Sequence, residues 1–233
     1  MADYEISEFL ESFATALGPE SDEVIEEMGA QARREGFPYV GPAVGGWLAM
    51  CARFADADRV FEFGSGFGYS AYWFARELPA DGEVVLTEID ADELDQAREY
   101  LARGGLADRA AFEHGDAIET IESYDGPFDV VLIDCQKERY AEAFEAVRDK
   151  VAPGGIVAAD NAVAGGSIDA GDLRAHFEDG GADAGSGEAT DGPEMDAMTR
   201  GIADYLEAVR GDEAFETTLL PLGEGVAVSQ REW

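Results

Sequence analysis

Short apolar runs alternate with amphipathic helical patterns through the middle of the chain, and this alternation limits the possible folds more than any other feature. Each run is long enough for a strand and too short for an ordinary helix. The runs cover residues 59–64, 83–89, 110–115, 128–134 and 155–160. Helical spacing of apolar residues occurs between them, near 68–78, 91–103, 117–123 and 137–150. Strands that alternate with helices form a parallel sheet covered on both faces, so we predict an α/β fold.

The two ends of the chain depart from this alternation. Apolar residues at helical spacing predict helices within 1–36 and a further one over 42–54. After a helix near 194–210, the runs FETTLLPLG and GVAVSQRE flank residues 223–225, a pattern that predicts an antiparallel hairpin. Five parallel strands followed by such a hairpin resemble the seven-stranded Rossmann-like sheet of class I methyltransferases. We expect a single domain over 1–233.

One segment differs in composition from the rest. Residues 165–194 are rich in Gly, Asp and Ala, with Asp and Glu far in excess of basic residues. A loop of this length within a compact domain is either a functional lid or a disordered insertion. The sequence leaves both interpretations open.

The balance of charge bears on habitat and partners. The chain has 51 Asp and Glu against 16 Lys and Arg, a net charge of −35, and its only lysines are Lys137 and Lys150. Its hydrophobic content of 46% nevertheless indicates a folded chain. At molar salt the Debye length is about 3 Å, which screens repulsion between carboxylates, and lysine depletion with acid excess resembles the proteins of salt-in halophilic archaea. An acidic surface without a basic stripe disfavours a nucleic-acid partner.

Three features concern the cellular compartment. No window approaches the ~18 consecutive apolar residues of a membrane span. The first residues, MADYEISEFL, are acidic where a secretory signal is basic. Cys51 and Cys135 lie far apart and show no ligand-like spacing, which favours reduced thiols. We therefore expect a cytoplasmic protein without a membrane partner.

A glycine-rich turn follows the first predicted strand. In VFEFGSGFGYS, Gly64, Gly66 and Gly68 occupy every second position. A dinucleotide fingerprint requires G-x-G-x-x-G instead. The observed spacing, preceded by Glu62, resembles motif I of S-adenosylmethionine-dependent methyltransferases, whose loop passes beneath the methionine end of the cofactor. An ordinary tight turn between strand and helix explains the same glycines.

Acidic residues end the second predicted strand and follow the third. Glu88 ends the second strand, where a carboxylate can accept both ribose hydroxyls of a nucleoside, and NAD enzymes use the same position. Asp116, in the sequence GDA, follows the strand where methyltransferases contact adenine. Asp116 is equally suited to cap the short helix that comes next. These residues indicate a bound nucleoside but do not distinguish NAD from S-adenosylmethionine.

The ends of the fourth and fifth strands carry the predicted chemistry. Asp134 ends one strand and Asp160 and Asn161 end the other. Neighbouring parallel strands lie about 4.8 Å apart, so these oxygens converge at one edge, where they suit Mg²⁺. Helix capping by Asp134 and a turn at 160–161 are the structural alternatives. Lys137 lies at the start of the next predicted helix, where a lysine is electrostatically unfavourable, which indicates a functional role.

Three segments together resemble one family. IDCQKERY, GGIVAADNAV and YVGPAVGG are similar to segments of the metal-dependent catechol and caffeoyl-CoA type O-methyltransferases. The resemblance runs from about residue 37 to 163 and resumes in the C-terminal helix and hairpin. It implies S-adenosylmethionine and a divalent cation as cofactors, a small-molecule acceptor with adjacent hydroxyls, and a homodimer.

The resemblance also implies a role for each matching residue. Glu62 and Ser70 would bind the methionine end, Glu88 the ribose, and Asp116 with Ala117 the adenine. Lys137 would take or steer the proton of the accepting hydroxyl. By this resemblance the cofactor would be bound by Val40, Glu62, Gly64, Ser65, Gly66, Gly68, Ser70, Glu88, Asp116, Ala117 and Asp134. The metal would be bound by Asp134, Asp160 and Asn161.

Departures from the family pattern leave the acceptor open. Cys135 and Gln136 replace bulkier or acidic residues, and 165–194 falls where family members vary their acceptor loop. An NAD-dependent oxidoreductase is disfavoured by the glycine spacing and the missing Tyr-x-x-x-Lys pair. A base methyltransferase is disfavoured because DCQK replaces a P-P-Y/W segment. A non-catalytic cofactor-binding module is disfavoured because it does not require Asp134 and Lys137, which are both present.

Overall fold

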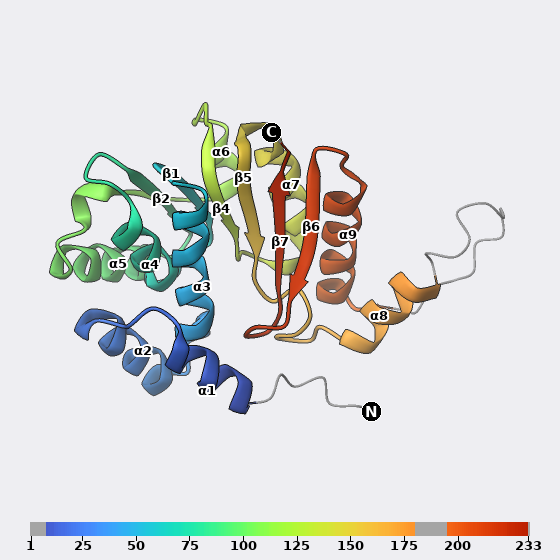
Figure 1. The fold of residues 1–233 in the computed structure, drawn as a ribbon, viewed down its shortest axis with the longest axis horizontal. Helices are drawn as coiled ribbons and strands as arrows, with labels where there is room; N and C mark the ends of the chain where they lie inside the picture. Colours follow the sequence, from blue (N-terminus) through green and yellow to red (C-terminus); the bar gives the residue numbers. More distant parts are fainter. Residues whose placement is uncertain (1–7, 180–194, 233) are drawn as a thin grey trace.

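Residues 8–179 and 195–232 are described in a computed structural model, and they form a seven-stranded sheet with helices on both sides (Figure 1). The strands are β1 (Arg59–Phe63), β2 (Glu83–Glu88), β3 (Ala110–His114), β4 (Phe128–Ile133), β5 (Val151–Ala159), β6 (Phe215–Leu220) and β7 (Val226–Arg231). Their order is β3-β2-β1-β4-β5-β7-β6. β1 to β5 pair in parallel, and β7 runs antiparallel to β5 and β6. The predicted parallel sheet with its C-terminal hairpin is confirmed.

The helices match the ranges predicted from apolar periodicity, except that no helix was predicted over 170–179. They are α1 (Glu8–Leu17), α2 (Glu23–Glu35), α3 (Gly41–Phe54), α4 (Tyr69–Glu77), α5 (Ala91–Arg103), α6 (Ala117–Ile121), α7 (Tyr140–Val147), α8 (Ala170–Asp179) and α9 (Ala197–Gly211). The 3₁₀ helices are η1 (Ala107–Arg109), η2 (Lys137–Arg139) and η3 (Arg148–Lys150). The predicted helix over 137–150 is helical throughout, but only α7 is α-helical, and η2 and η3 form its first and last turns. The N–H of Arg139 donates to the carbonyl oxygen of Gln136 at 2.9 Å, so this turn closes after three residues instead of four.

The predicted 165–194 insertion is partly helical. Its described part contains α8, and the N–H of Asp169, just before α8, donates to Thr199 Oγ1 on α9 at 3.0 Å. This bond ties the start of the insertion to the C-terminal helix. Residues 180–194 lie outside the described residues, so the choice between lid and disorder is not tested for them.

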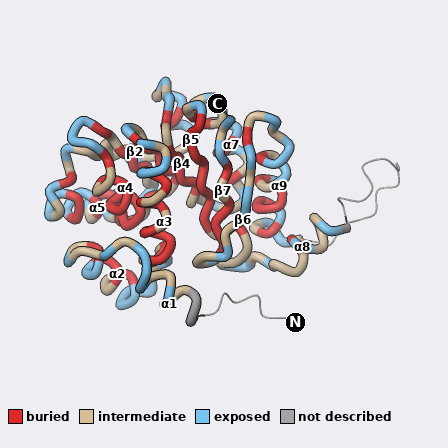
Figure 2. The backbone as a smooth tube through the Cα atoms, in the orientation of Figure 1, coloured by how far each residue is buried: buried red, intermediate tan, exposed pale blue. Residues whose placement is uncertain are grey.

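The core consists of two layers, one on each face of the sheet. Val60 packs with α2 to α5, whereas Phe61 and Phe63 on the same strand pack with α6, α7 and α9. Successive strand residues point to opposite faces, so a strand buried on both sides contributes to both layers. Figure 2 shows the resulting buried stripe along the central strands. Both layers hold the carboxyl ends of β1, β2, β4 and β5 in fixed positions.

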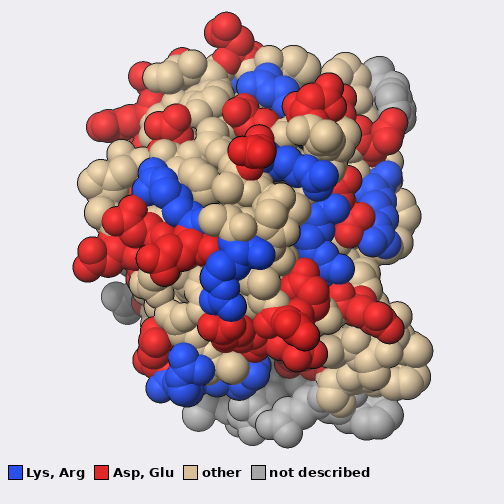
Figure 3. Space-filling view, turned by 90° about the vertical axis from the view of Figure 1, so that its left-hand side faces the viewer, with Lys and Arg blue, Asp and Glu red and all other residues tan. Residues whose placement is uncertain are grey.

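Acidic and basic side chains are mixed on the side of the molecule that carries α2, α4 and α5 (Figure 3). Arg103 on α5 pairs with Glu27 on α2, and Arg76 on α4 lies 3.8 Å from Asp22. These contacts join helices that lie far apart in the sequence, so Arg76 and Arg103 are engaged within the fold. Separately, none of the helices in the described segments has both the length and the apolar character needed to cross a membrane.

Candidate functional site

A cavity of about 730 Å³ opens at the carboxyl ends of the parallel strands. Its wall is formed by the loops after β1 to β5, the start of α3 and the turn between β6 and β7. The predicted site residues that line it are Val40, Gly64, Ser65, Gly66, Ser70, Glu88, Asp116, Ala117, Asp134, Lys137, Asp160 and Asn161. Glu62 and Gly68 do not line the cavity. The structure therefore brings most of the predicted residues to one site.

The glycine-rich loop turns tightly at Gly64. Gly64 has a φ of +83°, and a Cβ on it would lie 2.6 Å from the carbonyl oxygen of Asp134. Only glycine permits this approach between the loop and the end of β4. Gly68 follows the loop, and its neighbour is Ala97 on α5, so its position serves helix packing. The loop is therefore a tight turn and also lines the cavity, so the two interpretations of its glycines are compatible.

Glu62 is buried behind the loop and is hydrogen-bonded on one side. Its Oε1 accepts the hydroxyl of Ser70, and its Oε2 has no partner among the described residues. Burial, opposed by the Ser70 bond and assisted by the charges of Asp134 and Glu88, raises the pKa of Glu62 to about 8. A buried carboxyl oxygen without a partner favours a bound group that donates a hydrogen bond, such as an ammonium.

Glu88 is held by backbone donors. Its Oε2 accepts the N–H of Gly66 at 2.8 Å, and its Oε1 accepts those of Ile89 at 2.8 Å and Asp90 at 3.0 Å. These bonds fix the carboxylate against the glycine-rich loop. Each carboxylate oxygen can accept more than one hydrogen bond, so capacity for a hydroxyl donor remains.

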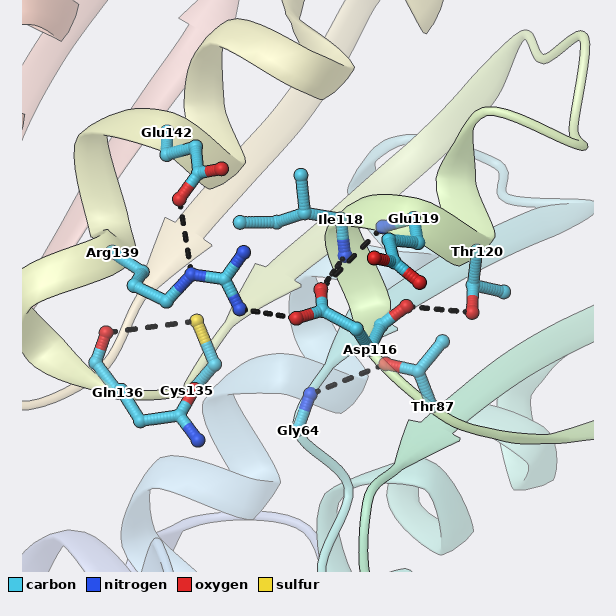
Figure 4. Close-up of polar contacts among 10 residues, drawn as sticks. All are labelled: Gly64, Thr87, Asp116, Ile118, Glu119, Thr120, Cys135, Gln136, Arg139 and Glu142. Atoms are coloured by element: carbon cyan, nitrogen blue, oxygen red, sulfur yellow. Dashed lines mark hydrogen bonds and ion pairs between the residues drawn. The ribbon is translucent and has the colours of Figure 1, made fainter.

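Asp116 lies between a helix start and an arginine (Figure 4). Its Oδ1 accepts the N–H of Ile118 at 2.8 Å, so the helix-capping interpretation is correct. Its Oδ2 pairs with Arg139, whose Nε also contacts Glu142 at 3.0 Å. The hydrogen bond from Arg139 lowers the pKa of Asp116. Sequence reasoning missed Arg139, which reaches the cavity because η2 turns it toward Asp116.

The predicted cation ligands meet at the ends of β4 and β5. The N–H of Asp160 donates to the carbonyl oxygen of Ile133 at 3.2 Å, so Asp134 and Asp160 end adjacent strands side by side. Lys137 Nζ lies 2.8 Å from Asp134 Oδ1 and 2.5 Å from Asn161 Oδ1. The structural alternative in which Asp134 caps a helix is not observed, since its carboxylate accepts from side chains.

Tyr140 completes this cluster, and sequence reasoning did not assign it. Its hydroxyl accepts from Lys137 Nζ at 2.7 Å and donates to the carbonyl oxygen of Asp160 at 3.0 Å. The ring is fully buried, and Lys137 Nζ also lies 4.9 Å from its centroid. Tyr140 therefore fixes the position of the lysine ammonium. The sequence feature that could have indicated this role is the position of Tyr140, three residues after Lys137, which places both on the same side of a helical turn.

The oxygens at this edge suit a divalent cation. Asp160 is 5% exposed, and its Oδ1 has no partner among the described residues. Burial, followed by the charge of Asp134, raises the pKa of Asp160. Within the described segments no three His, Cys, Asp or Glu side chains lie close enough to hold a metal, and the predicted ligand set consists of two carboxylates and the amide oxygen of Asn161. Two carboxylates and an amide oxygen are the donors that Mg²⁺ prefers.

A third residue that sequence reasoning missed comes from the far end of the chain. Glu224 lies in the turn between β6 and β7, lines the cavity and accepts a hydrogen bond from Asn161 Nδ2. The predicted hairpin marked the turn but gave no indication of what it would contact. Its position depends on β7 pairing with β5.

Known proteins resemble the chain along most of its length. The sequence model of a family described as O-methyltransferase matches residues 19–232. A catechol O-methyltransferase of Niastella koreensis is 32% identical over 158 residues, 65% of this chain and 71% of that protein. Caffeoyl-CoA O-methyltransferase 3 of Nicotiana tabacum is 25% identical over 197 residues, 80% of this chain and 74% of that protein.

A solved structure supports the fold independently. The O-methyltransferase TomG of Streptomyces achromogenes, solved in complex with S-adenosylmethionine, has a TM-score of 0.80 at 24% identity and covers 100% of both chains. The predicted class I methyltransferase fold is thereby confirmed. Because the family model covers most of the sequence, the chain belongs to the O-methyltransferase family and is a methyl-transferring enzyme.

Proposed function

We propose that this enzyme transfers the methyl group of S-adenosylmethionine to a hydroxyl of a small acceptor that carries two adjacent hydroxyls and is chelated by a divalent cation. The observation that supports this most is the cluster of Asp134, Asp160 and Asn161 around Lys137. The relatives named as catechol and caffeoyl-CoA O-methyltransferases favour the same acceptor type. The TomG complex favours the same methyl donor.

The cofactor would extend along the glycine-rich loop. Ser70 lines the cavity at one side of this loop, and Glu62, buried behind it, would offer the ammonium of the methionine end its Oε2, which has no partner among the described residues. Glu88, on the other side, would accept the ribose hydroxyls. The adenine would lie beyond it, near Asp116 and Ala117. Backbone at Gly64, Ser65, Gly66 and Val40 lines the same cavity and would contact the cofactor along its length.

Asp134, Asp160 and Asn161 would hold the cation, with Mg²⁺ as the first choice. When bound, it supplies positive charge that favours the ionised form of the acceptor hydroxyl. Lys137 would take or steer the proton of that hydroxyl, and Tyr140 would keep the lysine in place. The fixed ends of β4 and β5 would orient the acceptor for direct displacement, so positioning contributes much of the acceleration.

Calorimetric titration tests the cofactor first. We expect the purified protein, in concentrated KCl, to bind S-adenosylmethionine and not NAD. Catechol should then be methylated with Mg²⁺ and not after chelation of the metal. If the protein bound NAD and not S-adenosylmethionine, the proposed methyl donor would be wrong. Full activity in the presence of a chelator would refute the proposed requirement for a divalent cation.

Three further properties follow from the sequence and are proposed with it. The net charge of −35 supports a protein that works at high salt, where carboxylate repulsion is screened. We expect activity and thermal stability to rise with KCl concentration. We also propose a cytoplasmic homodimer of single-domain subunits, to be checked by sedimentation in the same salt.

A further inference from the structure

The turn between β6 and β7 is attached by its backbone to the loop that follows β5. The N–H of Ala162 donates to the carbonyl oxygen of Gly225 at 2.8 Å. The N–H groups of Val163 and Ala164 donate to the carbonyl oxygen of Glu224 at 3.2 and 2.9 Å. These bonds do not involve the side chain of Glu224. The turn is therefore fixed beside Asn161 whatever residue occupies position 224.

The side chain of Glu224 then reaches across this junction to Asn161. Its Oε2 accepts a hydrogen bond from Asn161 Nδ2. A Cβ on Gly165 would lie 2.4 Å from Glu224 Oε2 and 2.8 Å from Asn161 Nδ2. A side chain at residue 165 would therefore force these two groups to shift, and glycine leaves the bond undisturbed. Asn161 has a φ of +54°, a conformation that asparagine tolerates better than most residues.

The chemistry of the two partners of Asn161 fixes the orientation of its amide. The Lys137 ammonium can only donate, so it requires the amide oxygen, at 2.5 Å. The Glu224 carboxylate, when ionised, can only accept, so it requires the amide nitrogen. If the amide turned over, its NH₂ group would face the ammonium and its oxygen would face the carboxylate. Both new contacts would be repulsive.

The orientation matters because only the oxygen of an amide binds a hard cation. Asp160 Oδ1, buried and without a partner among the described residues, marks the cation position next to Asn161. An amide that turned over would remove one of the few protein oxygens from that position.

We propose that Glu224 is a positioning residue that holds the Asn161 amide with its oxygen toward the cation. The inference rests on the proposed function, since it presupposes the cation, and it extends that function to a residue in the far hairpin. Glu224 would not itself serve as a ligand of the cation. It acts on the ligand, as outer partners of metal ligands do.

Binding of Mn²⁺ to the full chain in concentrated KCl, followed by calorimetry, tests this role without measuring activity. Glu224→Ala should weaken Mn²⁺ binding by about tenfold or more. Glu224→Gln should retain most of the affinity, because the glutamine carbonyl oxygen accepts the same hydrogen bond. Glu216→Ala, on the exposed face of β6, removes a charge away from the site and should bind like the wild type.

The pattern of losses distinguishes positioning from a purely electrostatic effect and from damage to the fold. Equal losses in Glu224→Ala and Glu224→Gln would show that charge alone matters and would overturn the inference, as would unchanged affinity in Glu224→Ala. A variant that binds S-adenosylmethionine normally and unfolds at the wild-type temperature has kept its fold, so a loss confined to Mn²⁺ supports positioning. If the wild type itself lacks a saturable Mn²⁺ site, the cation proposal fails and this inference fails with it.

Discussion

The proposed cofactor side and the proposed cation side of the cavity are built differently. On the cofactor side, Glu88 is held by three backbone N–H groups and Asp116 by the start of α6. On the cation side, Asp134 and Asn161 are held by Lys137, and Asp160 keeps an oxygen without a described partner. Backbone bonds make the first side rigid without a ligand. On the second side, the Lys137 ammonium compensates the charge of a carboxylate from a separate element, and these contacts would have to rearrange when a cation binds.

The largest expected effect is at Asp160, on the cation side. We expect Asp160→Asn to lower kcat/KM by at least about a hundredfold, since it removes a charge from the proposed cation site. S-adenosylmethionine affinity should be retained, because the backbone-held groups remain. Steady-state kinetics with catechol and calorimetry give the two values. A parallel loss of cofactor affinity would contradict the independence of the two sides.

Lys137→Met is expected to be nearly as severe for turnover. The lysine is the only group proposed to handle the proton, and general acid–base groups contribute about a hundredfold or more. Mn²⁺ affinity should not fall, because Glu224 still holds the Asn161 amide and the ammonium no longer competes for Asp134 and Asn161. Kinetics and Mn²⁺ titration together check this. A variant that turns over normally would remove Lys137 from the mechanism.

A smaller effect is expected on the cofactor side, at Glu88. Glu88→Gln should weaken S-adenosylmethionine binding by about tenfold, the value of a charge-assisted hydrogen bond lost to a neutral one. Mn²⁺ affinity should not change, and this provides the matched comparison with Asp160→Asn. Calorimetric titration of both ligands measures the split. Loss of Mn²⁺ binding in Glu88→Gln would show that the two sides are coupled.

The last prediction concerns stability, and not activity or binding, and rests on Glu62. Its pKa is raised from an ordinary value of 4.5 to about 8 in the folded protein. The folded state therefore holds a proton that the unfolded state releases, so this stabilisation is complete below the unfolded pKa and is lost as the pH rises through about 8. Glu62→Gln should remove up to about 1.4 kcal/mol per pH unit from the slope of unfolding free energy over that window.

Chemical denaturation of the cofactor-free protein from pH 5 to 8, with Glu62→Gln as the comparison, measures this slope (about 1.4 kcal/mol per unit at most). Glu77→Gln is a suitable control. Glu77 lies at the end of α4, whereas Ser70, the partner of Glu62, lies at its start, and the partner of Glu77, Arg53, lies at the surface. Identical slopes in wild type and Glu62→Gln would show that Glu62 is ionised in the folded protein at neutral pH.

Periodic patterns predicted the fold well because burial is a local property of strands and helices. The predicted helix over 91–103 agrees with the bounds of α5, where Asp90 caps the first turn. The segment 137–150 is helical as predicted, but its first and last turns are 3₁₀. The spacing of its residues did not predict that Arg139, in the first of these turns, pairs with Asp116, because that ion pair spans 23 residues.

The sequence by itself determined the order of strands and helices, the glycine-rich loop and the place of each carboxylate at a strand end. These depend on the spacing of residues within one segment. Only the tertiary structure decided that Arg139 reaches Asp116, that Tyr140 holds Lys137, and that Glu224 reaches Asn161 across 63 residues. The last contact exists because β7 returns antiparallel beside β5. Such a contact depends on how distant strands pair, and the spacing of residues within either strand carries no information about it.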